Sequence, residues 1–156
     1  MAKVQWALMA LQISQNEQVK AFAQQVLADY TQSENDLVSI ANQHNLLLPR
    51  DLTAKDRATS NALAQLQGAD FDKAYMKAMV TGRQAELSKF QQEAAKSSTP
   101  GIAEWAKQTL PALQDDLKAS QKIAPAVGVK LPPASEGQPT RPEGAASSKP
   151  AAQNPY

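Results

Sequence analysis

The chain has 156 residues, with 16 Lys and Arg against 15 Asp and Glu, one His and no Cys. This length is enough for one domain with a packed core, and the balanced charge gives no support to binding of nucleic acids or anionic membranes. The lack of cysteine excludes disulfides, thiolate metal ligands and thiol catalysis. The longest apolar run, residues 6–11, is far shorter than the roughly 20 residues that span a bilayer, so we expect no membrane span.

The first half of the chain predicts two helices. A short one is expected over residues 2–14, and Asn16 is placed to cap a long one over 17–44 that Asn45 ends in a left-handed conformation. The long helix has residues spaced three or four apart along one face, the pattern of a helix packed lengthwise against others. These residues are Val19, Phe22, Val26, Tyr30, Ser33, Leu37, Ile40 and His44.

Three further helices are expected downstream. Thr53 is placed to begin a short helix over 54–67, which Gly68 ends. Asp70 is expected to cap a long helix that continues to about residue 96. Thr99 and Pro100 then open a last helix that runs to about 123, with Pro111 inside it.

The connector over residues 45–69 is too long for a simple turn. It has room to carry the chain back along the bundle, which makes the two long helices parallel. The sequence therefore predicts an all-α, ferritin-like four-helix bundle in residues 1–123, with a short crossover helix.

Residues 124–156 have a different composition. They hold seven of the ten prolines, with Gly, Ser and Ala and few large apolar groups. Such a segment buries too little surface to offset its ordering entropy. We therefore expect a disordered tail from residue 124.

A weak internal repeat relates residues 19–27 to 102–110 at an offset of 83. By the same offset, residues 2–14 match the second half of the helix over 70–96, so the first helix is expected to be truncated at its N-terminus. Roughly half of one bundle corner is then left uncovered. We expect an apolar groove there for a protein partner or for self-association, formed by Leu37, Ile40, Leu46, Leu47 and Leu48.

Four segments resemble one bacterial family. They are residues 19–24, residues 46–52 around Pro49, residues 109–113 and, most specifically, Phe-Asp-Lys-Ala-Tyr-Met-Lys-Ala-Met-Val at 71–80. Together they resemble the domain of unknown function 4142 over most of residues 1–123. The resemblance implies a ferritin-like bundle exported to the periplasm or envelope, and it implies no established reaction.

The chain departs from the histidines that the resemblance leads us to expect inside the bundle. Tyr30, Arg83 and Asp116 stand at three such positions, and Lys3 stands where a Glu is common. Arg83 and Tyr30 are each at the middle of a long helix. We therefore expect Arg83 and Asp116 to form a buried ion pair assisted by Tyr30; the alternative places Arg83 and Asp116 at the surface.

No catalytic motif is present, and we expect no cofactor. A carboxylate-bridged di-iron site needs Glu-x-x-His pairs, and no Glu here has a His three residues later. The sequence favours a non-catalytic binding or structural module. The alternative is a ferritin-like protein that handles metals or oxidants, for which the candidate ligands are Glu34, His44, Glu86 and Asp116.

Overall fold

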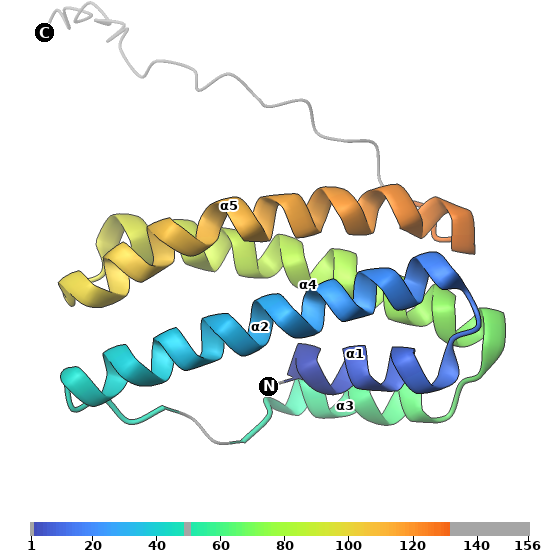
Figure 1. Cartoon of the computed structure of the whole chain (residues 1–156), viewed down its shortest axis with the longest axis horizontal. Helices are drawn as coiled ribbons and strands as arrows, with labels where there is room; N and C mark the ends of the chain where they lie inside the picture. The colour runs from blue at the N-terminus through green and yellow to red at the C-terminus, as the bar shows by residue number, and fades with distance from the viewer. Residues whose placement is uncertain (1, 49–50, 132–156) are drawn as a thin grey trace, which may run out of the picture.

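The computed structural model describes residues 2–48 and 51–131, and within these ranges it contains five α-helices and no strand. This confirms the predicted all-α bundle (Figure 1). No helix in the described part of the chain has the length and hydropathy needed to cross a membrane. The helices are α1 (Ala2–Ile13), α2 (Glu17–Gln43), α3 (Ala54–Ala64), α4 (Gly68–Lys96) and α5 (Pro100–Ile123), followed by the short 3-10 helix η1 (Ala124–Val127).

Most helix ends lie where the capping residues predict. The Asn16 side chain accepts hydrogen bonds from the first turn of α2, and Thr53 Oγ1 accepts one from the Asp56 N–H at 3.1 Å. Asn45 follows α2 with φ of 53°, the left-handed conformation expected. The prediction for Asp70 was wrong, because α4 begins two residues earlier. Gly68, with φ of 55°, lets the chain turn directly into the helix, and Asp70 lies in its first turn.

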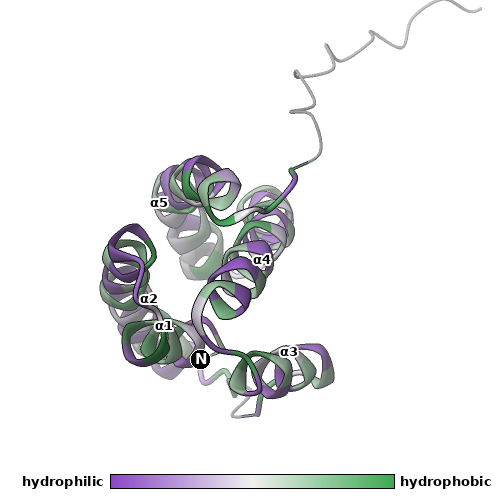
Figure 2. Cartoon of the chain, turned by 90° about the vertical axis from the view of Figure 1, so that its right-hand side faces the viewer, coloured by the Kyte–Doolittle hydropathy of each residue, from purple (hydrophilic) through white to green (hydrophobic). Residues whose placement is uncertain are grey.

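The connector between α2 and α4 sets the topology. Figure 1 shows that α3 carries the chain back, so that α2 and α4 run in the same direction, as the length of the connector predicts. Seen along the bundle, α1, α2, α4 and α5 surround the core and α3 lies outside them (Figure 2). Trp6 of α1 fixes α3 in place by donating a hydrogen bond from Nε1 to Ser60 Oγ at 2.7 Å.

The bundle has two unequal halves, because α1 is 12 residues long and α2 is 27. We call the half beside α1 the closed half, and the half containing the end of α2 and the start of α5 the open half. In the closed half α2 buries Val19, Phe22, Ala23 and Val26, whereas beyond Val26 it buries only Ala41. On α4, burial likewise ends at Arg83.

The packed chain continues beyond the predicted boundary at residue 123. Ala124 is fully buried and Val129 is 7% exposed, and Leu131 packs against the core. The high proline content concealed these apolar contacts from the sequence prediction. The remainder of the predicted tail, residues 132–156, lies outside the described residues.

Candidate functional site

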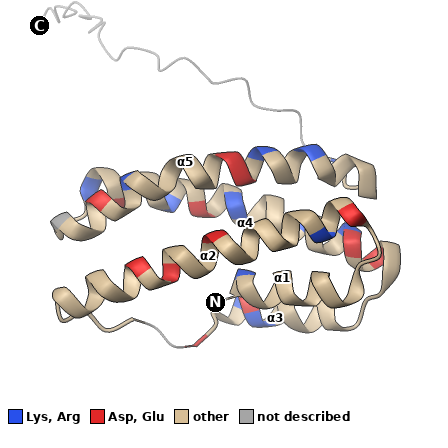
Figure 3. Cartoon of the chain, viewed as in Figure 1, with Lys and Arg blue, Asp and Glu red and all other residues tan. Residues whose placement is uncertain are grey.

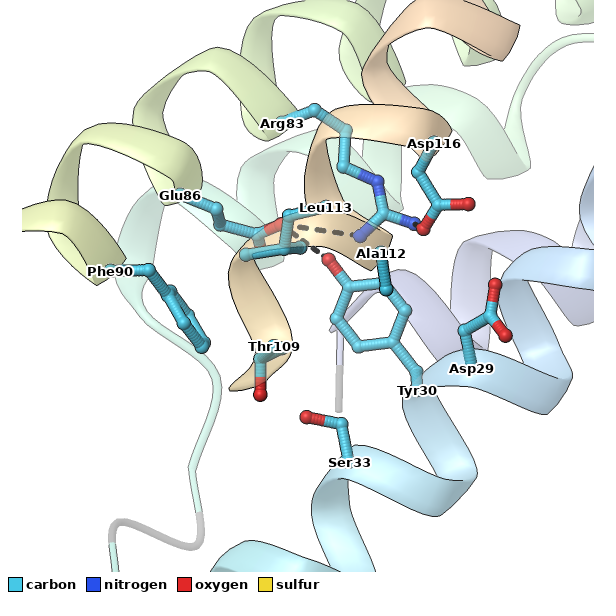
Figure 4. Close-up of a pocket in the computed structure, with 10 residues that line it drawn as sticks. All are labelled: Asp29, Tyr30, Ser33, Arg83, Glu86, Phe90, Thr109, Ala112, Leu113 and Asp116. Atoms are coloured by element: carbon cyan, nitrogen blue, oxygen red, sulfur yellow. Dashed lines mark hydrogen bonds and ion pairs between the residues drawn. The ribbon is translucent and has the colours of Figure 1, made fainter. Parts of the chain in front are cut away.

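Charged and polar side chains from four helices meet at the border between the two halves. Arg83 Nη2 lies 2.6 Å from Asp116 Oδ2, and Arg83 Nη1 lies 3.6 Å from Glu86 Oε2. Glu86 also accepts a hydrogen bond from the Tyr30 hydroxyl and pairs with Lys3 Nζ at 3.2 Å. We call these five residues the polar cluster; Figure 4 shows all of them except Lys3. The cluster links α1, α2, α4 and α5.

The cations of the polar cluster are held by aromatic rings as well as by carboxylates. Arg83 is 1% exposed, and its guanidinium lies 4.5 Å from the centre of the Tyr30 ring. Lys3 Nζ lies 4.6 Å from the centre of the Trp6 ring. Both distances are within the range of cation–π attraction. Each buried positive charge is therefore compensated from more than one side.

Gly82 makes room for Lys3 to reach across from α1 to α4. A Cβ at this position would lie 3.0 Å from Lys3 Cε and 3.3 Å from Nζ. A side chain on Gly82 would thus press on the end of Lys3, which would have to shift by a few tenths of an ångström. The absence of a side chain at Gly82 is part of how the sequence brings α1 into the polar cluster.

Burial controls the proton affinities of the polar cluster. It raises the pKa of Asp116 to about 6, against the opposing effect of Arg83, and the charge and hydrogen bond of Asp29 raise it further. Figure 4 shows the Asp29 carboxyl pointing toward Asp116. Burial, and next the charge of Glu86, also raise the pKa of Tyr30, so its hydroxyl stays a neutral donor. The polar cluster consequently contains two cations, two carboxyl groups and a neutral phenol, and its Asp116 holds a proton more tightly than an exposed aspartate does.

A cavity of about 60 Å³ adjoins the polar cluster. Apart from Tyr30, Arg83, Glu86 and Asp116, it is lined by Asp29, Ser33, Phe90, Thr109, Ala112 and Leu113 (Figure 4). Of the three carboxylates at its wall, Glu86 is engaged by Arg83 and Lys3, Asp116 is engaged by Arg83, and Asp29 accepts hydrogen bonds from Gln25 Nε2. Their geometry is that of an ion-pair network spanning the helices.

The four alternative metal ligands do not come together in one group in the described part of the chain. Glu86 and Asp116 contact Arg83, and Glu34 lies farther along α2. His44 lies at the end of α2, against the start of α5, where a Cβ on Gly101 would come within 2.9 Å of its Nε2. Across residues 2–48 and 51–131, His, Asp and Glu nowhere gather in a group of three able to hold a metal ion.

An apolar groove lies in the open half, next to the polar cluster. Its volume is about 330 Å³, and Phe90 and Trp105 form an aromatic pair on it with ring centres 4.9 Å apart. The remaining lining residues are Tyr30, Ser33, Glu34, Leu37, Val38 and Leu48. We refer to this set of eight residues as the groove. Leu47, 99% exposed, follows α2 on the connector nearby.

The sequence placed only part of the groove. Leu37 and Leu48 line it as expected, but Ile40 faces a separate hollow beside Gly101 and Trp105. Ile40 lies almost one turn farther along the helix than Leu37, where the lack of a side chain on Gly101 lets α5 approach it. Leu46 and Leu47 are exposed on the connector and are not among the lining residues.

Comparison with known families gives one match. Residues 1–123 match the family model described as domain of unknown function 4142. The chain belongs to this family. Comparison with curated proteins and with solved structures gave no match. The DUF4142 match therefore covers all five helices of this chain and carries no named activity with it.

Within this DUF4142 domain, the four residues that differ from those expected from the family resemblance lie together in the structure. Lys3, Tyr30, Arg83 and Asp116 all belong to the polar cluster. Sequence reasoning did not place the fifth member, Glu86, in this cluster and named it only as an alternative metal ligand. Its spacing of three residues from Arg83 was the available signal, because residues three apart share a helix face.

Proposed function

We propose that this protein is a non-catalytic bundle of the bacterial envelope that acts as a binding module, with the groove as its working surface. The observation that carries the proposal is an apolar groove of about 330 Å³ in the open half, with Leu37, Phe90 and Trp105 on its wall. A concave apolar surface of this size falls in the range of ligand and partner sites. The envelope location rests on the family resemblance.

The polar cluster supports a role without catalysis. An acid or base catalyst must exchange protons with a substrate, and a metal site needs open carboxylates or imidazoles. Here Glu86 is engaged by Tyr30, Arg83 and Lys3, and Asp116 by Arg83. We assign these side chains to holding the four helices together beside the groove.

A neutral fluorescent hydrophobic probe, N-phenyl-1-naphthylamine, tests the proposal. We expect saturable binding of one probe per chain, weakened about tenfold or more by Leu37→Gln because the change places an amide on the groove wall. Leu8→Gln is the matched control, since Leu8 is 44% exposed on α1 and is not a groove residue. Absence of binding, or equal binding by the two variants, would refute the groove as the working surface.

A further inference from the structure

Exposed apolar side chains gather beside the groove. In the described part of the chain, the large apolar side chains left exposed are Leu8, Val38, Leu46 and Leu47. Leu8 lies on α1, whereas Val38 is a groove residue and the other two directly precede Leu48, which also lines the groove. The open half therefore presents an apolar hollow and an apolar projection side by side. Such a concentration of exposed apolar side chains marks an interaction surface.

The turn after α2 fixes the position of the projection. Asn45 has φ of 53°, and the N–H of Leu46 donates a hydrogen bond to the carbonyl of Ala41 at 2.8 Å. This left-handed turn is a common way to end a helix, and it orders the backbone up to Leu46. Leu47 comes next and is 99% exposed, so its side chain has almost no packing role within the chain. Covering an apolar side chain that ordered backbone holds in water is favourable, because little further ordering is needed.

The charges around the groove form no block of one sign. Figure 3 shows both signs of charge at the open half. Glu34 already has an interaction partner, and Asp36 is exposed and accepts a hydrogen bond from Gln32 Nε2 at 2.9 Å. On α4 and α5, oppositely charged residues stand three or four positions apart, namely Lys89 with Glu93 and Glu104 with Lys107. Two copies of this surface can therefore meet without strong repulsion between like charges.

We propose that the groove binds a second copy of this chain in a two-fold symmetric dimer, in which Leu47 of each copy packs on the Phe90 and Trp105 pair of the other. This inference rests on the proposed function and names its partner. In such a dimer the same surface supplies the contacts of both copies, so a projection and a hollow must lie close together on it. Leu47 is the chain neighbour of the groove residue Leu48, and a two-fold axis beside the groove therefore exchanges the two projections.

The size of this surface predicts a weak, reversible dimer. From Tyr30 to Gln43, α2 extends about 20 Å, and helices pack about 10 Å apart, so two of them present a face about 20 Å wide. The footprint is on the order of 400 Å² per chain, about half of that in a standard interface. We therefore expect a dissociation constant on the order of 100 µM.

Sedimentation equilibrium of the full chain, from about 5 µM to about 1 mM, tests the dimer. Leu47→Gln and Leu37→Gln should each raise the dissociation constant about tenfold or more, because each change occurs twice in a symmetric dimer. Leu8→Gln is the matched control and should leave the dissociation constant unchanged, since Leu8 is exposed on α1. A wild type that stays monomeric at the highest concentration, or a dimer that either groove-side change leaves unaffected, overturns the inference.

Cross-linking locates the contact, because the chain has no Cys. A chain with Leu47→Cys is mixed with an isotope-labelled chain with Val38→Cys and treated with a short bismaleimide, and mass spectrometry identifies the mixed product. Its yield should be about tenfold higher than with Leu8→Cys in place of Leu47→Cys, because the dimer holds Leu47 beside the groove that Val38 lines. Equal yields would place Leu47 away from the partner's groove and overturn the inference.

The outcomes separate this inference from the proposed function. Binding of N-phenyl-1-naphthylamine by a chain that stays monomeric throughout the sedimentation series overturns the dimer and leaves the groove as a site for small apolar ligands. Circular dichroism confirms that the variants are folded, and Leu47→Gln removes a side chain that is 99% exposed, so a change in its sedimentation reports on the dimer contact. Failure of both probe binding and dimerisation overturns both proposals.

Discussion

The closed and open halves of the bundle are built from the same long helices, yet they are packed differently. On α2, Val26 of the apolar stripe is fully buried in the closed half, whereas Leu37 of the same stripe in the open half is only partly buried and Val38 beside it is 49% exposed. The neighbour that differs is α1, which lies only along the closed half (Figure 1). The comparison teaches that the apolar stripe of a bundle helix creates a core only where all four corners are filled. Where one corner is open, the same stripe becomes a surface available for binding.

The polar cluster lies at the border between the halves and provides the strongest test of this comparison. We expect Arg83→Leu to lower the free energy of unfolding at pH 7 by about 3–5 kcal/mol, because Asp116 would stay buried without its cation and Glu86 would keep only Lys3 as a cation. Urea denaturation monitored by circular dichroism measures the change. A loss of this size would show that the polar cluster, which lies at the border between the two halves, also stabilises the packing between them.

Two further variants serve as controls for Arg83→Leu. Lys118→Leu removes an exposed ion pair with Asp115, whose side chains are 74% and 77% exposed, and should change the free energy of unfolding by about 0.5 kcal/mol or less. Arg83→Leu combined with Asp116→Leu should recover part of the loss, since the unpaired carboxylate is removed as well. Wild-type stability of Arg83→Leu alone would mean that Arg83 does not hold the halves together.

A matched pair of substitutions on α2 tests the comparison directly. Val26→Ala should lower the free energy of unfolding by about 2 kcal/mol, because it deletes buried methyl groups and leaves a cavity. Val38→Ala makes the same chemical change in the open half and should cost about 0.5 kcal/mol or less. Thermal and urea unfolding of both proteins provide the measurement. Equal losses would contradict the contrast in packing, since they would require Val38 to be covered in solution.

The sequence was sufficient for the fold because local signals determine most of it. The spacing from Val19 to Ile40 indicates a helix packed lengthwise, and Asn16, Asn45 and Thr53 lie at helix ends. The long connector correctly predicts that α2 and α4 run parallel, because a direct turn would need far fewer residues.

The site was harder to predict because it depends on how whole helices are rotated about their axes. Tyr30 and Arg83 were expected at similar depth because each lies at the middle of its helix, and Asp116 was expected to pair with Arg83. The contact of Lys3 with Glu86 instead requires α1 to approach α4 closely over Gly82. Ile40 was misplaced for a similar reason, since a small rotation of α2 turns it toward α5. Spacing along one helix gives no information about such contacts between helices.

The pH dependence of the free energy of unfolding tests the polar cluster at the border through a smaller expected effect. The folded pKa of Asp116, about 6, exceeds its ordinary value of 3.8, so the folded protein retains a proton that the unfolded chain has released. The contribution of Asp116 is therefore present below about pH 4 and decreases as the pH rises to about 6. Asp116→Asn cannot titrate. The stability of the wild type relative to this variant should fall by on the order of 1 kcal/mol from pH 4 to pH 7.

The same titration should affect the two halves unequally. Asp29 on α2 lies beside Asp116 on α5 at the border, and loss of the Asp116 proton places a negative charge next to it. The closed half keeps its apolar core, whereas the open half buries only Ala41 on α2 and nothing on α4 beyond Arg83. Amide exchange at pH 5 and pH 7, corrected for intrinsic rates, should show protection lost first in the open half of wild type, and less so in Asp116→Asn. If the stability of the wild type relative to Asp116→Asn instead rises with pH, the charge of Arg83 outweighs burial and keeps Asp116 ionised. The ion pair at the border would then link the two halves equally at pH 5 and pH 7.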